Sequence, residues 1–133
     1  VKEGVRLHPV SAGGSLRTIG RDIETKTGIL LPKGSIIFMP FIMLLRNPNI
    51  FENEHSFQPS RWENPTKKMT DAFVPFSLGK QNCIGQSLAN AELHCIAARI
   101  CAEFDLEVKE EGTVDYILTL TPVGARLIAR KAA

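Results

Sequence analysis

The most regular pattern of hydrophobic positions lies in the second half of the chain, over residues 84–106. Apolar side chains recur there every three to four positions, which is the spacing of one face of an α-helix. They are Leu88, Ala91, Cys95 and Ala98, with Leu93, Ile96, Ile100 and Phe104 widening the stripe. The pattern predicts one long helix with a broad buried face.

A different pattern follows this helix. Residues 107–131 read as short runs around turns, of which YILTLTP alternates apolar and polar positions and ARLIARK is the last. Alternation with a period of two is typical of a half-buried strand. We predict strands around turns, with residues 125–131 as the final strand.

The first half of the chain contains shorter elements. Residues 1–9 read as a helical turn that stops at Pro9, because the residue before a proline is pushed out of the helical region. The Gly/Ser-rich stretch 10–17 is predicted as a loop. Two β-rich runs flank LPKG, where Pro32 and Gly34 suit a tight turn, so residues 25–41 are predicted as a hairpin or a pair of strands.

The middle of the chain is predicted to be mostly irregular. MLLRN is expected to form a short helix ended by Asn47 and Pro48, and residues 47–75 are rich in Pro, Asn and polar side chains. An irregular stretch of this length inside one domain is uncommon and usually has a function. We detect no repeat or linker, so residues 1–133 are predicted to form one structural unit.

Composition excludes several classes of protein. With 133 residues, 44% hydrophobic and 23% charged, the chain resembles an ordinary globular sequence. The net charge of +2 gives no reason to expect a nucleic-acid partner. No apolar run reaches the ~18 residues of a membrane span. The chain starts at Val1, without methionine, within a helical pattern, so we expect it to be a fragment.

The candidate chemistry is centred on Cys83, which lies between Gly79 and Gly85 in FSLGKQNCIG. Three cysteines are an odd number for a disulfide framework. Free cysteines are usually buried and inert, and this is our prediction for Cys95 and Cys101 on the helix stripe. A zinc site near His94 and Cys95 is disfavoured because the paired spacing of a tetrahedral zinc site is missing.

Cys83 differs from the other two cysteines in its surroundings. It comes at the start of the predicted long helix, where free N–H groups and the helix dipole favour a thiolate. Gly79 permits a positive φ, and Gly85 removes a side chain two residues after the sulfur. A nucleophilic cysteine would use the same position, but His8, His55 and His94 carry no signature of a partner base.

Four motifs give the chain a family resemblance. FSLGKQNCIG is similar to the haem-ligand signature F-x-x-G-x-R-x-C-x-G of the cytochrome P-450 monooxygenases, with Gln81 in place of the usual basic residue. EGVR resembles the E-x-x-R helix of that family, FQPSRW its F-x-P-x-R-F/W element, and GILLPKGS its strand and turn. These motifs occur in the family's order, and the resemblance covers essentially the whole chain.

The resemblance implies a fold and a cofactor. The fold would be the mixed α/β, mainly helical cytochrome P-450 fold, and residues 1–133 would be the C-terminal part of its single catalytic domain. The cofactor would be haem b (iron protoporphyrin IX), with the Cys83 thiolate as iron ligand. The other residues that would contact it, by the same resemblance, are Phe76, Gly79, Gly85, Arg17 and Gln81.

The resemblance also implies an ion network of Glu3, Arg6 and Arg61 that fixes the irregular segment to the first helix. Read without the family, Glu3 and Arg6 share one helix face, as in an ordinary surface ion pair worth at most ~0.5 kcal/mol. For Arg17, the alternative to a contact with the cofactor is an ordinary exposed arginine, and the two interpretations stay equally open. We expect the network to specify position more than to add stability.

The implied activity is insertion of one oxygen atom from O₂ into a small apolar substrate. The implied electron donor is a flavoprotein NADPH reductase near Lys80, and the implied location is the endoplasmic reticulum membrane, through an anchor outside this chain. The 133 residues alone are expected to be inactive. Two other hypotheses stay open: a haem-thiolate isomerase or dehydratase on the same scaffold, and a truncated remnant without haem.

Overall fold

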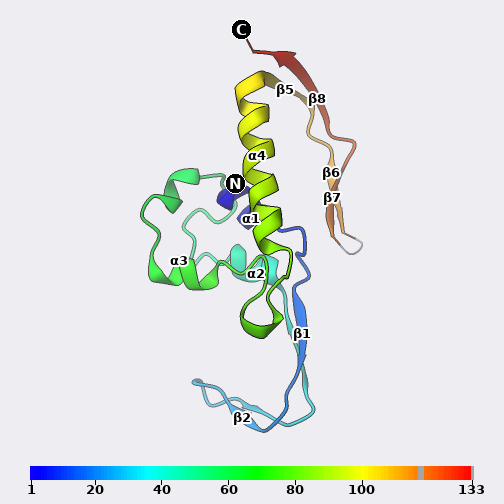
Figure 1. Cartoon of the computed structure of the whole chain (residues 1–133). Coiled ribbons are helices and arrows are strands. Elements are labelled where there is room, and N and C mark those ends of the chain that lie inside the picture. Colours follow the sequence, from blue (N-terminus) through cyan, green and yellow to red (C-terminus); the bar gives the residue numbers. More distant parts are fainter. Residues whose placement is uncertain (117–118, 133) are drawn as a thin grey trace.

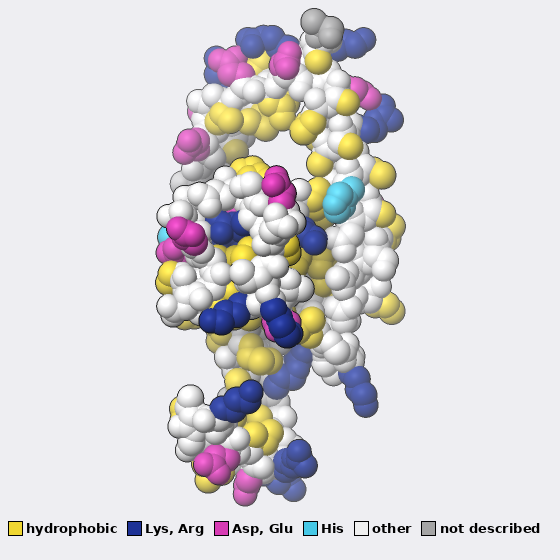
Figure 2. Space-filling model, turned by 90° about the vertical axis from the view of Figure 1, so that its left-hand side faces the viewer, with side chains coloured by type: hydrophobic (Ala, Val, Ile, Leu, Met, Phe, Trp, Pro, Cys, Tyr) yellow, Lys and Arg dark blue, Asp and Glu magenta, His cyan; other side chains and the backbone are white. Residues whose placement is uncertain are grey.

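Helix α4 (Gln86–Glu103) is the longest element of the computed structural model, which describes residues 1–116 and 119–132 (Figure 1). The predicted long helix is therefore confirmed. Its predicted burial is wrong for this chain, because no described element covers the apolar stripe: Leu88 is 64% exposed and Ile96 57%. Cys95 and Cys101 are exposed for the same reason. Figure 2 likewise shows hydrophobic side chains spread over the outside of the molecule.

The C-terminal strands form two nested antiparallel pairs. Strand β5 (Phe104–Glu110) follows α4 directly and pairs with β8 (Arg126–Lys131), which confirms the predicted final strand. Inside this pair, β6 (Thr113–Tyr116) pairs with β7 (Leu120–Val123). Residues 117 and 118 of the predicted alternating run lie outside the described residues. The inner hairpin also reaches the start of the chain, because the N–H of Leu120 donates to the carbonyl of Val10 (3.0 Å).

The N-terminal strands form a second nested ribbon. Strand β1 (Ser15–Thr18) pairs with β4 (Ile36–Met39), and β2 (Ile23–Glu24) pairs with β3 (Leu30–Leu31) further along the same arm. LPKG does form a turn, since the N–H of Ser35 donates to the carbonyl of Pro32 (3.1 Å). Of the two predicted alternatives, the pair of strands is confirmed and the hairpin is wrong: β3 and β4 flank this turn without pairing, and the chain reverses at residues 25–28 instead.

The loop predicted for residues 10–17 is wrong in its second half, where Ser15 begins strand β1. Gly14 makes this possible. Its φ is +83°, and a Cβ at this position would collide with the carbonyl oxygen of Met39 on the partner strand. The glycine therefore allows a sharp entry into the strand and a close approach of the two backbones.

The remaining elements are short and surround the candidate site. Helix α1 (Lys2–Leu7) is the predicted helical turn, and α2 (Phe41–Leu45) begins two residues earlier than MLLRN suggested, directly after Pro40. The segment predicted as irregular contains a 3₁₀ helix η1 (Pro59–Trp62) and helix α3 (Lys67–Ala72). A second 3₁₀ turn, η2 (Gly79–Gln81), precedes Cys83.

Two small apolar clusters hold these elements together. Phe41 and Leu45 of α2 pack with Val74, and Phe51 packs with Met69 and Ala72 of α3. Leu44 is packed against both clusters. The core of this chain therefore lies between α2, α3 and the segment that leads to Cys83, and it contains no residue of α4 among the residues described.

Candidate functional site

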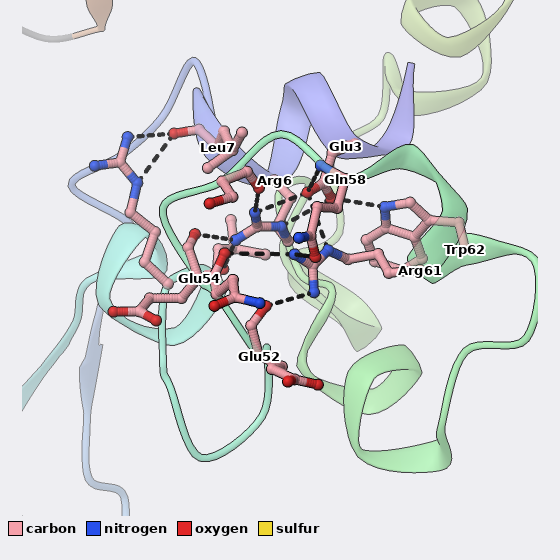
Figure 3. Close-up of polar contacts among 12 residues, drawn as sticks. Glu3, Arg6, Leu7, Glu52, Glu54, Gln58, Arg61 and Trp62 are labelled. Atoms are coloured by element: carbon pink, nitrogen blue, oxygen red, sulfur yellow. Dashed lines mark hydrogen bonds and ion pairs between the residues drawn. The ribbon is translucent and has the colours of Figure 1, made fainter.

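The carboxylate of Glu3 is the centre of a buried polar network (Figure 3). The side chain is 1% exposed. Its Oε1 accepts hydrogen bonds from Arg6 Nη2 (2.9 Å), Arg61 Nε (3.0 Å) and the backbone N–H of Gln58 (3.0 Å). Its Oε2 accepts from Arg6 Nε and from Trp62 Nε1, both at 2.9 Å. Five donors thus converge on one carboxylate that water does not reach.

Arg6 is buried completely and also makes five hydrogen bonds. Besides the two to Glu3, it donates to the carbonyl oxygens of Leu45 (2.9 Å), Glu54 (2.7 Å) and Ser56 (3.2 Å). A guanidinium has five N–H donors, so the five hydrogen bonds of Arg6 use all of its donors. Arg6 therefore connects helix α1 to helix α2 and to the segment before η1.

The network changes the acidity of Glu3. Burial by itself raises the pKa of this carboxyl, but the hydrogen bonds from Arg6, Gln58, Trp62 and Arg61 outweigh it and lower the pKa to about 2. Glu3 is thus an ion at all physiological pH values. Nearby, burial and the positive charge of Arg6 lower the pKa of Arg46, whose guanidinium donates to the carbonyl of Leu7.

Arg61 extends the network along residues 47–75, the meander. It donates to the carbonyl of Glu52 (2.9 Å) and the side chain of Gln58 (3.1 Å) as well as to Glu3. Sequence patterns identified the three charged residues but missed the indole N–H of Trp62 and the backbone N–H of Gln58. The indole N–H could have been predicted, because Trp62 is part of the FQPSRW motif.

The loop that carries Cys83 is closed by its own backbone. The N–H of Cys83 donates to the carbonyl of Phe76 (2.9 Å), and the N–H of Asn82 donates to that of Gly79 (3.1 Å). Gly79 has a φ of +65° at the turn. The helix N-cap is Gly85, so Cys83 lies two residues before the cap, at the start of the long helix as predicted. Its side chain is exposed.

A cavity of about 380 Å³ opens beside Cys83. It brings together four residues predicted from the sequence to contact the cofactor, from two separate segments: Arg17 on β1, and Phe76, Gln81 and Cys83 in the loop before α4. The rest of the wall is formed by Val10, Ser11, Gly14, Ser15, Phe41, Pro75 and Ser77. Gly79 and Gly85 are not part of this wall, although a Cβ at Gly85 would lie 3.9 Å from the sulfur of Cys83.

Two serines of this wall were not predicted. The hydroxyl of Ser77 accepts a long hydrogen bond from Arg17 Nη2 (3.4 Å). The hydroxyl of Ser15 is buried, and among the described residues it has no hydrogen-bond partner. Nothing in the sequence distinguishes either serine from a surface residue. A soft sulfur ligand and a guanidinium on one partly apolar cavity suit a metal-containing group with acidic substituents.

The family model "Cytochrome P450" matches residues 1–129 of the chain. The chain belongs to the cytochrome P450 family. A curated relative, cytochrome P450 monooxygenase penB of Penicillium thymicola, is 38% identical over 81% of this chain and 24% of its own length. The trichothecene C-15 hydroxylase of Fusarium sporotrichioides is 34% identical over 81% of this chain and 23% of its own.

Solved structures of the P450 family show the same fold. The retinoic acid-bound cyanobacterial CYP120A1 aligns with a TM-score of 0.86 and 24% identity, over 98% of this chain and 31% of that one. Cytochrome P450 CYP102L1 aligns with a TM-score of 0.83 and 26% identity, over 99% and 31%. The predicted P450 fold is confirmed. The chain spans about a quarter of the curated P450 relatives that it matches.

The family implies a haem cofactor. As for membranes, no helix within residues 1–116 and 119–132 combines the length and the apolar character that a bilayer crossing requires.

Proposed function

We propose that the protein containing this chain is a haem-thiolate monooxygenase in which Cys83 binds the iron of haem b. One observation carries the proposal: Cys83 shares a cavity with Arg17, the only charged side chain among the described residues that line it. The relatives named as a monooxygenase and a hydroxylase support the reaction class. The substrate would be a small apolar molecule.

The residues around the cavity fit this cofactor. The Cys83 thiolate is a soft ligand of the kind that holds haem iron in P450 enzymes. Gly79 turns the loop, and the bond from the Cys83 N–H to the Phe76 carbonyl fixes its approach. The space beside the sulfur that a side chain at Gly85 would enter is left open. Phe76 gives the cavity an apolar wall on the same side as Cys83.

Arg17 and Gln81 would hold the acidic propionates of the haem. Arg17 offers a charge-assisted hydrogen bond, about twice as strong as a neutral one. Gln81 stands where the haem-ligand signature that this loop resembles usually has a basic residue, and its amide offers a neutral hydrogen bond. We infer that the haem of this protein is held mainly through Arg17 on this side, and more weakly than when position 81 is also cationic.

The network around Glu3 would have a positioning role. Arg6 fixes the carbonyl of Leu45 at the end of α2, and Leu45 and Phe41 of α2 pack against Val74. The carbonyl of Val74 accepts the N–H of Ser77 (3.0 Å), which belongs to the wall of the cavity. A continuous set of contacts thus runs from the buried ion network to the cysteine loop.

When bound, the haem would supply the one-electron and dioxygen chemistry, to which a thiolate ligand contributes electron density that favours O–O cleavage. The electrons would come from a flavoprotein NADPH reductase docked near Lys80, and the protein would be located at the endoplasmic reticulum membrane. Since the chain spans about a quarter of its relatives, we propose that residues 1–133 form one side of the haem site and are inactive alone.

The spectrum of the reduced, carbon monoxide-treated full-length gene product tests the proposal. The Soret band is expected at the red-shifted position of a thiolate complex. Cys83→Ser should abolish that band, while Cys95→Ser and Cys101→Ser, both at exposed positions on α4, should leave it intact. Absence of the band in the wild type, or equal loss in all three variants, would refute the assignment. Oxygen uptake coupled to NADPH oxidation then separates a monooxygenase from an isomerase or dehydratase.

A further inference from the structure

Ser77 has a backbone conformation that serine rarely adopts. Its φ is +66°, in the left-handed region that glycine enters freely and other residues enter at an energetic cost. A residue kept in such a conformation at a ligand site points to a function for its side chain. Only one other non-glycine residue in the described part of the chain, Asn53 with φ +48°, has a positive φ.

The side chain of Ser77 has one contact that explains its presence. Its hydroxyl accepts from Arg17 Nη2 (3.4 Å), while Arg17 Nη1 donates to the carbonyl of Leu16 (2.8 Å). The guanidinium is thus held at both of its terminal nitrogens. Ser77 itself is fixed through its N–H to Val74. Arg17 and Ser77 line the cavity together with Cys83.

We propose that Ser77 is a positioning residue that orients Arg17 toward the acidic groups of the cofactor. The inference rests on the proposed function, since it takes the haem propionates as the partner of Arg17. The orientation of Arg17 matters more for binding the propionates here than it would at a site with two cationic side chains. Because Gln81 is neutral, a rotated Arg17 would leave the propionates without a charged partner among the described wall residues.

The alternative is that Ser77 only shapes the loop. Ser77→Gly separates the two readings because glycine keeps, and even favours, the positive φ while removing the hydroxyl. If the residue only shapes the loop, this variant should bind haem as well as the wild type. If it positions Arg17, the variant should be as stable as the wild type and lose haem faster.

The experiment measures haem loss from the full-length gene product by transfer to excess apomyoglobin. We expect Ser77→Gly to lose haem about tenfold faster, the effect of weakening one hydrogen bond to a charged group. Asn53→Gly, which relieves the same kind of backbone conformation in the meander, should not change the rate. In an Arg17→Ala background, Ser77→Gly should add little, because the residue acts through Arg17.

A second experiment changes the cofactor instead of the protein and measures haem loss in the same way. Reconstitution with haem dimethyl ester removes the carboxylates, so the difference between wild type and Ser77→Gly should vanish with this cofactor. An unchanged loss rate with haem, or an equal difference with the ester, would overturn the inference while leaving the thiolate band in place. Loss of that band in the wild type would instead refute the proposed function.

Discussion

The indole N–H of Trp62 donates to Oε2 of Glu3 at 2.9 Å, so an uncharged side chain completes the coordination of the buried carboxylate. Trp62 also packs against Phe73 with 4.8 Å between ring centroids. The residue therefore contributes a hydrogen bond to an ion and an aromatic contact at the same position, and the two contributions can be separated.

Trp62→Phe is expected to lower the free energy of unfolding by about 1.5–3 kcal/mol, the worth of a hydrogen bond to a charged group, while keeping most of the aromatic packing. Urea denaturation of the full-length gene product measures it. In a Glu3→Gln background the same change should be smaller, because the acceptor is no longer charged. Equal losses in both backgrounds would assign the whole effect to packing.

Arg6→Lys should destabilise the fold by about 3–5 kcal/mol, although it conserves the charge. An ammonium has three donors, and Arg6 uses five. The matched control is Arg130→Lys, whose exposed ion pair with Glu107 (3.0 Å) should contribute less than ~1 kcal/mol. Similar effects of the two substitutions in urea denaturation would show that Arg6 acts only through its charge.

Stability should fall in acid through Glu3. Because the fold lowers its pKa from 4.5 to about 2, the ionised carboxylate stabilises the fold fully above pH 4.5, and this contribution disappears as the pH falls toward 2. The contribution is on the order of 3 kcal/mol. Urea denaturation between pH 6 and pH 3 follows the larger part of this loss. Glu3→Gln should be less stable at pH 6 but show a flatter dependence, and parallel curves would contradict the assignment.

Gly14→Ala should destabilise the protein by several kcal/mol more than Gly28→Ala. Both glycines have nearly the same positive φ, +83° and +81°, so the backbone strain of about 1–3 kcal/mol is shared. Only at Gly14 does the added methyl group collide with a backbone atom, the carbonyl oxygen of Met39; around Gly28 the space is open. Equal melting temperatures for the two variants would exclude a role for this close approach.

The sequence predicts best what is local. Helix α4 follows from periodicity alone, and the N-terminal helical turn follows from Pro9. Strand β1 was missed because four residues after two glycines carry little pattern, and their state depends on pairing with β4 further along the chain. The hairpin was misplaced because TKTG and LPKG are both turn sequences, and only the strand pairing decides between them.

The candidate site divides in the same way. Cys83 and the charged residues of the network stand in recognisable motifs, so the sequence identifies them. The hydrogen bond between Ser77 and Arg17 joins segments sixty positions apart and has no local pattern. The predicted burial of α4 was wrong for a third reason. An apolar stripe indicates that a helix face packs against another element, and none of the described residues packs against this one.

The hydrogen bond between Leu120 and Val10 also has a consequence for biosynthesis. Val10 belongs to the wall of the cavity, yet its carbonyl finds this partner almost at the other end of the chain. Closing so large a loop is slow compared with forming local helices. During translation, the carbonyl of Val10 therefore lacks this partner until Leu120 has left the ribosome, long after all the residues of the cavity wall have been synthesised.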